Sequence, residues 1–119
     1  MSTSIEKIDE LTYLVAEVDA SKASSYRNLY FHMKEIFQFP ETPSRNYPAV
    51  MMDYMTDLGW LPEKNFKLVV RNMQKAGKMD TKTLADFRDS LENLREYWEN
   101  QKARNGRDWE DNFIIEFND

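Results

Sequence analysis

The stretch IFQFPETPSRNYPAVMMDYMTDLGWLP, residues 36–62, is the part of the sequence around which the rest is organised. Two prolines and a polar break, Phe39 to Asn46, separate the end of one predicted helix from the start of another. The second helix is expected to stop at Gly59. The stretch contains no metal-ligand cluster, nucleotide-binding loop or nucleophile–base set. It combines an acidic and aromatic surface with a buried face of aromatic residues and methionines, which is typical of a binding element.

The residues before this stretch predict an amphipathic helix, because its apolar side chains recur every three or four positions. Ser21 or Ser24 is expected to cap its first turn with a side-chain oxygen. The Phe39-Pro40 step ends it, since the residue before a proline is pushed out of the helical region. The only histidine, His32, falls off the apolar face and is interpreted as a surface residue. The residues assigned to the buried face are Tyr26, Leu29, Tyr30, Met33 and Phe37.

The second helix is expected to begin after Asn46, which can cap it, with a proline in its first turn where no N–H is needed. Helical periodicity divides its residues between a core face and an exposed face. The core face is predicted to hold Tyr47, Met51, Tyr54, Met55 and Leu58. The opposite face is predicted to hold Ala49, Met52, Asp53 and Thr56, with Asp57 to one side.

Three segments rich in β-forming residues predict strands: residues 11–19, residues 65–70 with a possible extension to 73, and residues 112–117. A long helix capped by Asp80 or Thr81 lies before the last strand. Its apolar residues alternate at spacings of three and four: Leu84, Phe87, Leu91, Leu94 and Trp98. The predicted fold is α/β, with the order β-α-α-β-α-β and a small three-stranded parallel sheet covered by helices. Residues 1–119 are expected to form one domain, with residues 1–10 flexible.

The composition excludes several classes of protein. A net charge of −5 argues against binding nucleic acid through phosphates, and it is compatible with a basic protein partner or with simple solubility. The absence of cysteine excludes disulfides and thiol chemistry. No apolar run approaches the roughly 20 residues that span a bilayer, and the start of the chain has no secretory pattern. A cytoplasmic protein without a cofactor, a metal or a membrane association is therefore expected.

The element order and residues 37–62 resemble the barstar-like family of ribonuclease inhibitors. That family shows a helix ending in aromatic-x-aromatic-Pro, matched by Phe37-Gln38-Phe39-Pro40. A loop of the type Gly-x-Asn-aromatic-Asp-Ala follows in the family. Here it is matched by Arg45-Asn46-Tyr47 and by Ala49. The helix then ends in an Asp-Leu-x-Trp-Leu-Pro type of segment. Its matching residues are Asp53, Thr56, Asp57, Leu58, Trp60, Leu61 and Pro62.

The chain departs from the family pattern in the loop and the second helix. The loop glycine is replaced by Ser44. Counted forward from Pro40, the family's two helix acids fall on Pro48 and Met52; counted back from Trp60, the second acid falls on Asp53. The two counts differ by one residue, which implies an insertion in the helix region.

The resemblance implies an inhibitor or immunity protein that blocks the cleft of a basic toxin nuclease, most often a ribonuclease, as a monomer in a 1:1 complex. Carboxylates on the helix and its preceding loop would replace substrate phosphate. The implied partner-binding residues are Asp53, Asp57, Met52, Ala49, Glu41, Asn46, Tyr47 and Trp60. Asp53 is the central acid in this interpretation, and Asp57 would join it one helical turn later.

Simpler interpretations remain open. Asp53 and Asp57 could be ordinary solvated carboxylates, and Tyr47 could serve only core packing. The chain could also be a non-enzymatic interaction module that binds through another face, such as the long helix with Glu92, Glu96 and Glu99. A hydrolase using Asp53 and Asp57 is the least favoured possibility, because no substrate pocket is indicated. We therefore do not expect an enzyme.

Overall fold

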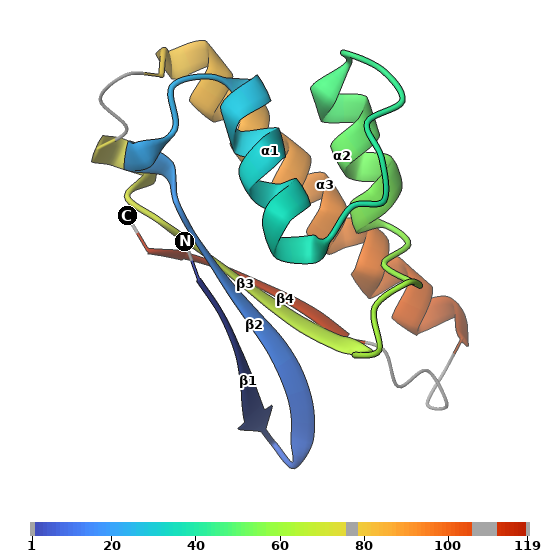
Figure 1. Cartoon of the computed structure of the whole chain (residues 1–119). Helices are drawn as coiled ribbons and strands as arrows, with labels where there is room; N and C mark the ends of the chain where they lie inside the picture. The colour runs from blue at the N-terminus through green and yellow to red at the C-terminus, as the bar shows by residue number, and fades with distance from the viewer. Residues whose placement is uncertain (1, 76–78, 106–111, 119) are drawn as a thin grey trace.

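The predicted parallel strands form the centre of the sheet in the computed structural model, which describes residues 2–75, 79–105 and 112–118. Strands β2 (Leu11–Asp19), β3 (Asn65–Arg71) and β4 (Asn112–Asn118) lie side by side in that order and run parallel (Figure 1). The register pairs Leu14 with Phe66 and Phe66 with Phe113, so their side chains share one face. The prediction of three parallel strands in these segments is confirmed.

A fourth strand, β1 (Ser2–Ile8), corrects the prediction for the start of the chain. It pairs antiparallel with β2, so the sheet is mixed, and residues 2–8 are not a flexible tail. The strands are joined at Asp9 and Glu10, which both have positive φ, as tight hairpins require. Only one edge of β1 is paired, and edge strands carry polar and charged residues on both faces. The usual alternation of apolar and polar residues is therefore absent from this strand.

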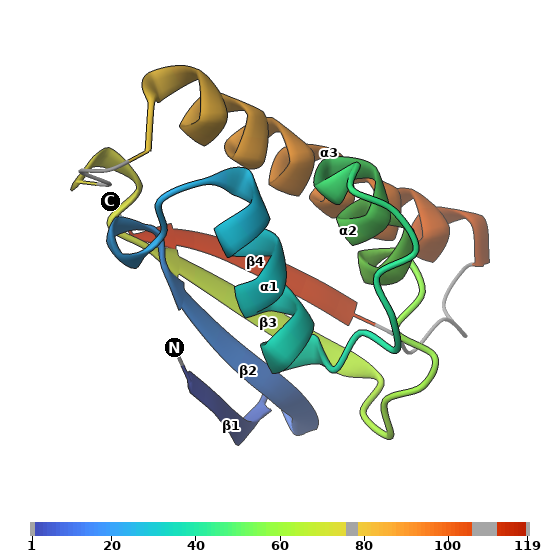
Figure 2. The same cartoon turned by 45° about the horizontal axis from the view of Figure 1, so that its top comes forward.

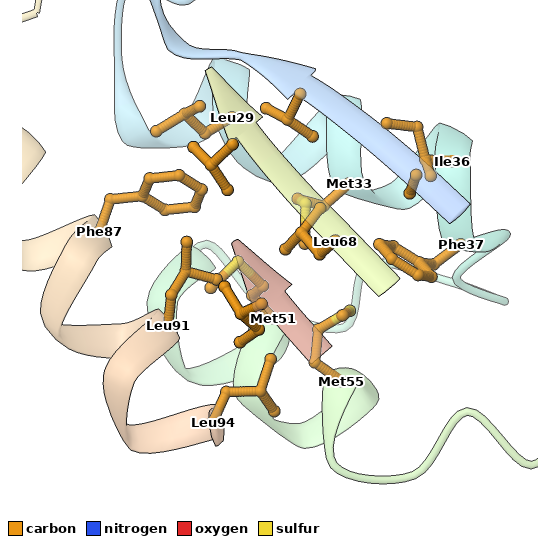
Figure 3. Packing of buried hydrophobic residues seen from close by; sticks show 14 of the residues in the cluster. Leu29, Met33, Ile36, Phe37, Met51, Met55, Leu68, Phe87, Leu91 and Leu94 are labelled. Carbon is orange, nitrogen blue, oxygen red and sulfur yellow. The ribbon is translucent and has the colours of Figure 1, made fainter. Parts of the chain in front are cut away.

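The described helices cover one face of the sheet (Figure 2): α1 (Tyr26–Phe37), α2 (Tyr47–Met55) and α3 (Thr81–Asn105). Helix α2 packs against both α1 and α3. Short 3-10 turns at Ala20–Lys22 and Met73–Lys75 follow β2 and β3. The core lies between helices and sheet. Figure 3 shows side chains from all three helices and β3 meeting there, labelled Leu29, Met33, Ile36, Phe37, Met51, Met55, Leu68, Phe87, Leu91 and Leu94.

The helix ends follow the predictions only in part. Asn46 caps α2 and Asp80 caps α3 as expected. Helix α1 is capped by Ser25, whose hydroxyl accepts from the N–H of Asn28 at 3.1 Å, and not by Ser21 or Ser24. Helix α2 ends at Met55, earlier than the predicted stop at Gly59, because the chain turns at once and reaches a positive φ at Leu58.

The core face of α2 is rotated slightly from the prediction. Met51, Met55 and Leu58 are buried as expected, and Val50 joins them. Tyr47 and Tyr54 are only half-buried.

The opposite face of the sheet has a small apolar cluster of its own. Tyr13, Val15 and Val69 are buried there, with Ile8 of β1 packed against them. Burial raises the pKa of the Tyr13 phenol, and the charge of Asp9 adds to this effect. Because no described helix covers this face, β1 supplies much of the cover for the cluster.

Replacing Ile8 with Thr tests the contribution of β1. We expect Ile8→Thr to lower the free energy of unfolding by about 1 kcal/mol, because it removes apolar contact from the cluster while keeping a β-branched side chain. The matched control is Ile5→Thr in the same strand, where the side chain is 57% exposed; its effect should stay within about 0.5 kcal/mol. Urea denaturation measures both. Equal, negligible effects would mean that residues 2–8 do not form part of the folded sheet.

Candidate protein-binding site

An aromatic seam, consisting of Tyr30, Phe39, Tyr47, Tyr54 and Trp60, joins α1 to α2. At one end the ring of Tyr47 lies 5.2 Å from that of Tyr30, and at the other the ring of Tyr54 lies 5.0 Å from that of Phe39. The start of α2 therefore packs beside α1, and its last turn packs on the residues that follow α1. This alignment directs one face of α2 into the core and leaves the other face outward.

The loop between the helices is held by polar contacts with α1. The hydroxyl of Tyr30 donates to the carbonyl of Glu41 at 3.3 Å and lies 3.0 Å from the hydroxyl of Thr42. The ammonium of Lys34 also donates to Thr42, at 3.0 Å. At the far end of the loop, the Asn46 side chain accepts from the N–H of Ala49 at 3.4 Å. The loop that precedes α2 is therefore fixed at both ends, which preorganises it for binding.

Trp60 anchors the chain after α2. Its indole Nε1 donates to the carbonyl of Phe37 at 2.9 Å, and its ring packs edge-on against Tyr54, with 5.5 Å between centroids. The ring is half-buried, so part of it remains at the surface. The same holds for Tyr47, and both residues therefore combine a structural contact with an exposed edge.

Asp53 lies on the outward face of α2. Its side chain is exposed, and within the described residues it makes no hydrogen bond or ion pair. Ala49, one turn earlier, is also exposed, and Met52 is half-buried against the edge of the core. A carboxylate held on a helix without an internal partner is available to a partner molecule.

Glu41 and Asp53 both act electrostatically on Tyr54, a residue that the sequence pattern assigned to the core. Partial burial raises the pKa of the Tyr54 phenol, and the negative charges of Glu41 and, more weakly, Asp53 raise it further. The acid of the loop and the acid of the helix therefore act on the same phenol. The structure adds Tyr54 to the site. No sequence pattern separates it from the core residues, because it repeats at the same spacing.

Asp57 does not occupy the predicted helical position. Helix α2 ends at Met55, and Asp57 lies in the following turn, where its Oδ1 accepts from the N–H of Gly59 at 3.1 Å. A Cβ atom at Gly59 would lie 2.9 Å from that same oxygen. Asp57 therefore shapes the turn that leads to Trp60, and its spacing of four from Asp53 does not place the two on consecutive turns of one helix.

His32 is less exposed than expected. It is half-buried on α1, and its Nδ1 is buried with no hydrogen-bond partner in the described part of the chain. Its interpretation as a surface residue is therefore only partly right.

The carboxyl edge of the parallel strands, where α/β proteins often bind ligands, carries a polar cluster that stabilises the fold. Asp19 accepts from the N–H and hydroxyl of Ser21 and from the side chain of Asn72, which lowers the pKa of Asp19. No group of acidic or histidine side chains suited to a metal ion occurs in residues 2–75, 79–105 or 112–118. Among these same residues no helix is long and apolar enough to cross a membrane.

These features define a small α/β protein with a preorganised loop and a surface helix that carries one exposed acid, Asp53, a combination suited to protein recognition. Residues 13–109 match the family described as Barstar (barnase inhibitor), and the chain belongs to that family. The resemblance in residues 37–62 is thereby confirmed. The family description names inhibition of barnase, which a protein performs by binding its target. A search of curated proteins found no match.

The two acids can be separated by their effect on the free protein. We expect Asp57→Ala to lower the free energy of unfolding by about 1 kcal/mol, because it removes the acceptor that organises the turn before Trp60. Asp53→Ala should change it by less than about 0.5 kcal/mol, since this carboxylate has no described partner to lose. Thermal and urea denaturation measure both variants. A larger loss for Asp53→Ala than for Asp57→Ala would contradict this assignment.

Proposed function

We propose that this protein inhibits a nuclease of the ribonuclease type. It does so by placing α2 and its preceding loop over the active-site cleft of that nuclease. The partner is a basic toxin, and the inhibitor acts as an immunity protein in the cytoplasm, as a monomer in a 1:1 complex. The observation that carries the proposal is Asp53, on the outward face of α2 in a chain of the Barstar family: its carboxylate is exposed and has no hydrogen bond or ion pair within the described residues.

The chemistry of the site supports a basic cleft as its target. A nuclease cleft is lined by cations that bind substrate phosphate, and carboxylates can occupy the same positions. Asp53 on α2 and Glu41 in the loop both raise the pKa of the Tyr54 phenol through their negative charge. The phenol and the two acids would together face the cationic centre of the cleft.

The remaining residues of the site have distinct roles in this proposal. The small side chain of Ala49, one turn before Asp53, leaves room for the partner to approach the helix backbone closely. Met52 provides an apolar contact at the edge of the core. The exposed edges of Tyr47 and Trp60 supply aromatic contacts, which are common at interface hot spots. Asn46 and Asp57 act indirectly, because their side chains fix the start of α2 and the turn after it.

Binding and inhibition are tested first with the wild-type chain. The tagged chain is used to recover partners from its source cells at low and moderate salt, and recovered proteins are assayed for cleavage of RNA and DNA. Purified barnase serves as a defined second probe, because the family description names it. The proposal requires a nuclease whose cleavage is blocked by the wild-type chain. Failure to inhibit any recovered nuclease or barnase would overturn it.

The site is then tested with two charge reversals of equal size. We expect Asp53→Lys to raise the dissociation constant for the inhibited nuclease at least about 30-fold, the loss typical of an interface hot spot. The control is Glu96→Lys on the exposed surface of α3, which changes the net charge equally. Isothermal titration calorimetry measures both. If Glu96→Lys were the damaging change, the protein would bind through its long helix, as a module that uses a different face.

A further inference from the structure

A row of two cations and an aromatic ring runs along α1, beside the site described above. The row consists of Arg27, Phe31 and Lys34, whose spacings of four and three place them on one side of the helix. The guanidinium of Arg27 lies 4.9 Å from the centroid of the Phe31 ring, and the ammonium of Lys34 lies 5.8 Å from it. Both cations are therefore held at defined positions by the same ring.

Neither of these two cations forms an ion pair with an acid in the described part of the chain. Within the described residues, four ion pairs involve Lys67, Arg71, Lys82 and Arg95, and none involves Arg27 or Lys34. Among the described residues, the Lys34 ammonium donates to the neutral hydroxyl of Thr42. Phe31 is half-buried, so part of its ring remains at the surface. In a chain with a net charge of −5, this row is a local region of positive charge with an aromatic centre.

The row is continuous with the site on α2. The Phe31 ring packs against Tyr47, the first residue of α2, with 5.8 Å between centroids. Lys34 contacts Thr42 in the loop that leads to α2. A partner that covers the loop and the first turn of α2 therefore lies next to the row.

A stable interface is wider than α2, so the partner must also contact elements beside this helix. Helix α2 has nine residues and is about 13 Å long. A standard interface covers about 800 Å² on each partner, which is roughly 28 Å across. The contact must therefore extend beyond α2. Helix α1 offers an arginine and aromatic rings on that border, and these residue types are enriched at interfaces.

We propose that Arg27, Phe31 and Lys34 form a second part of the partner-binding surface. The two cations pair with carboxylates that lie beside the basic cleft of the nuclease, and the Phe31 ring packs between them. This inference rests on the proposed function. It specifies the partner further: a nuclease with a basic centre facing Asp53 and an acidic region facing α1. The two cations also repel nucleases whose cleft is surrounded by basic residues on that side, so the row selects among partners as well as adding contacts.

The test uses the nuclease that the wild-type chain inhibits. The double charge reversal Arg27→Glu/Lys34→Glu should raise its dissociation constant at least about 10-fold, because acids would then face acids. The charge-conserving variant Arg27→Lys/Lys34→Arg should stay within about threefold of the wild type. A matched reversal at two exposed positions elsewhere, Lys7→Glu/Lys82→Glu, controls for net charge. Thermal denaturation of each variant establishes that it is folded.

Three results would overturn the inference. Unchanged binding by Arg27→Glu/Lys34→Glu would place the row outside the interface, and tighter binding would mean that it faces basic residues. Binding of a fluorescent single-stranded RNA by the isolated wild-type chain, lost in the reversal, would assign the row to nucleic acid instead. In each case the wild-type chain still inhibits its nuclease, so the proposed function stands. Failure of the wild-type chain to inhibit any nuclease removes the proposed function itself, and this inference with it.

Discussion

The packing of α1 against α2 through the aromatic seam is the constraint on which the rest of the surface depends. The contacts of Tyr30 with Tyr47 and of Phe39 with Tyr54 fix the rotation of α2 about its own axis and its position relative to α1. A helix of nine residues has little stability of its own, so its orientation comes from these tertiary contacts. Because α2 contacts α1 and α3 and the core lies beneath it, its outward face is a rigid platform that requires no partner to form.

The same seam explains why the candidate site is built from residues with two roles. Tyr47 and Trp60 each pack against α1 or its end with one part of the ring and leave another part at the surface. Asp57 and Asn46 use their side chains to shape the chain at the two ends of the helix. The side chain of Asp53, unlike that of Asp57, makes no hydrogen bond or ion pair within the described residues. A surface in which most members also stabilise the fold can change its target by altering only a few residues, such as Asp53 and Ala49.

Much of the fold could be predicted from periodicity. The predicted bounds of β2 coincide with the observed ones, because its run of β-forming residues ends at charged or polar positions on both sides. Asn46 and Asp80 were recognisable as caps because their side chains suit that role and precede apolar repeats. Strand β1 could not be predicted, since an edge strand such as Ser2–Ile8 lacks the alternation on which strand prediction depends. The end of α2 was placed too late, because the left-handed backbone at Leu58 comes from tertiary packing of a residue that normally avoids it.

The arrangement of the sheet also determines the order in which parts of the molecule can form. Leu14 of β2 pairs with Phe66 of β3 at a distance of 52 positions along the chain. Such long-range pairing is slow, because the entropy of closing a large loop is lost before the stabilising contacts form. The β1–β2 hairpin and the α1–α2 unit, in contrast, depend on contacts between near neighbours in sequence. The aromatic contacts that orient the surface carrying Asp53 thus join residues closer in sequence than those paired in the parallel sheet.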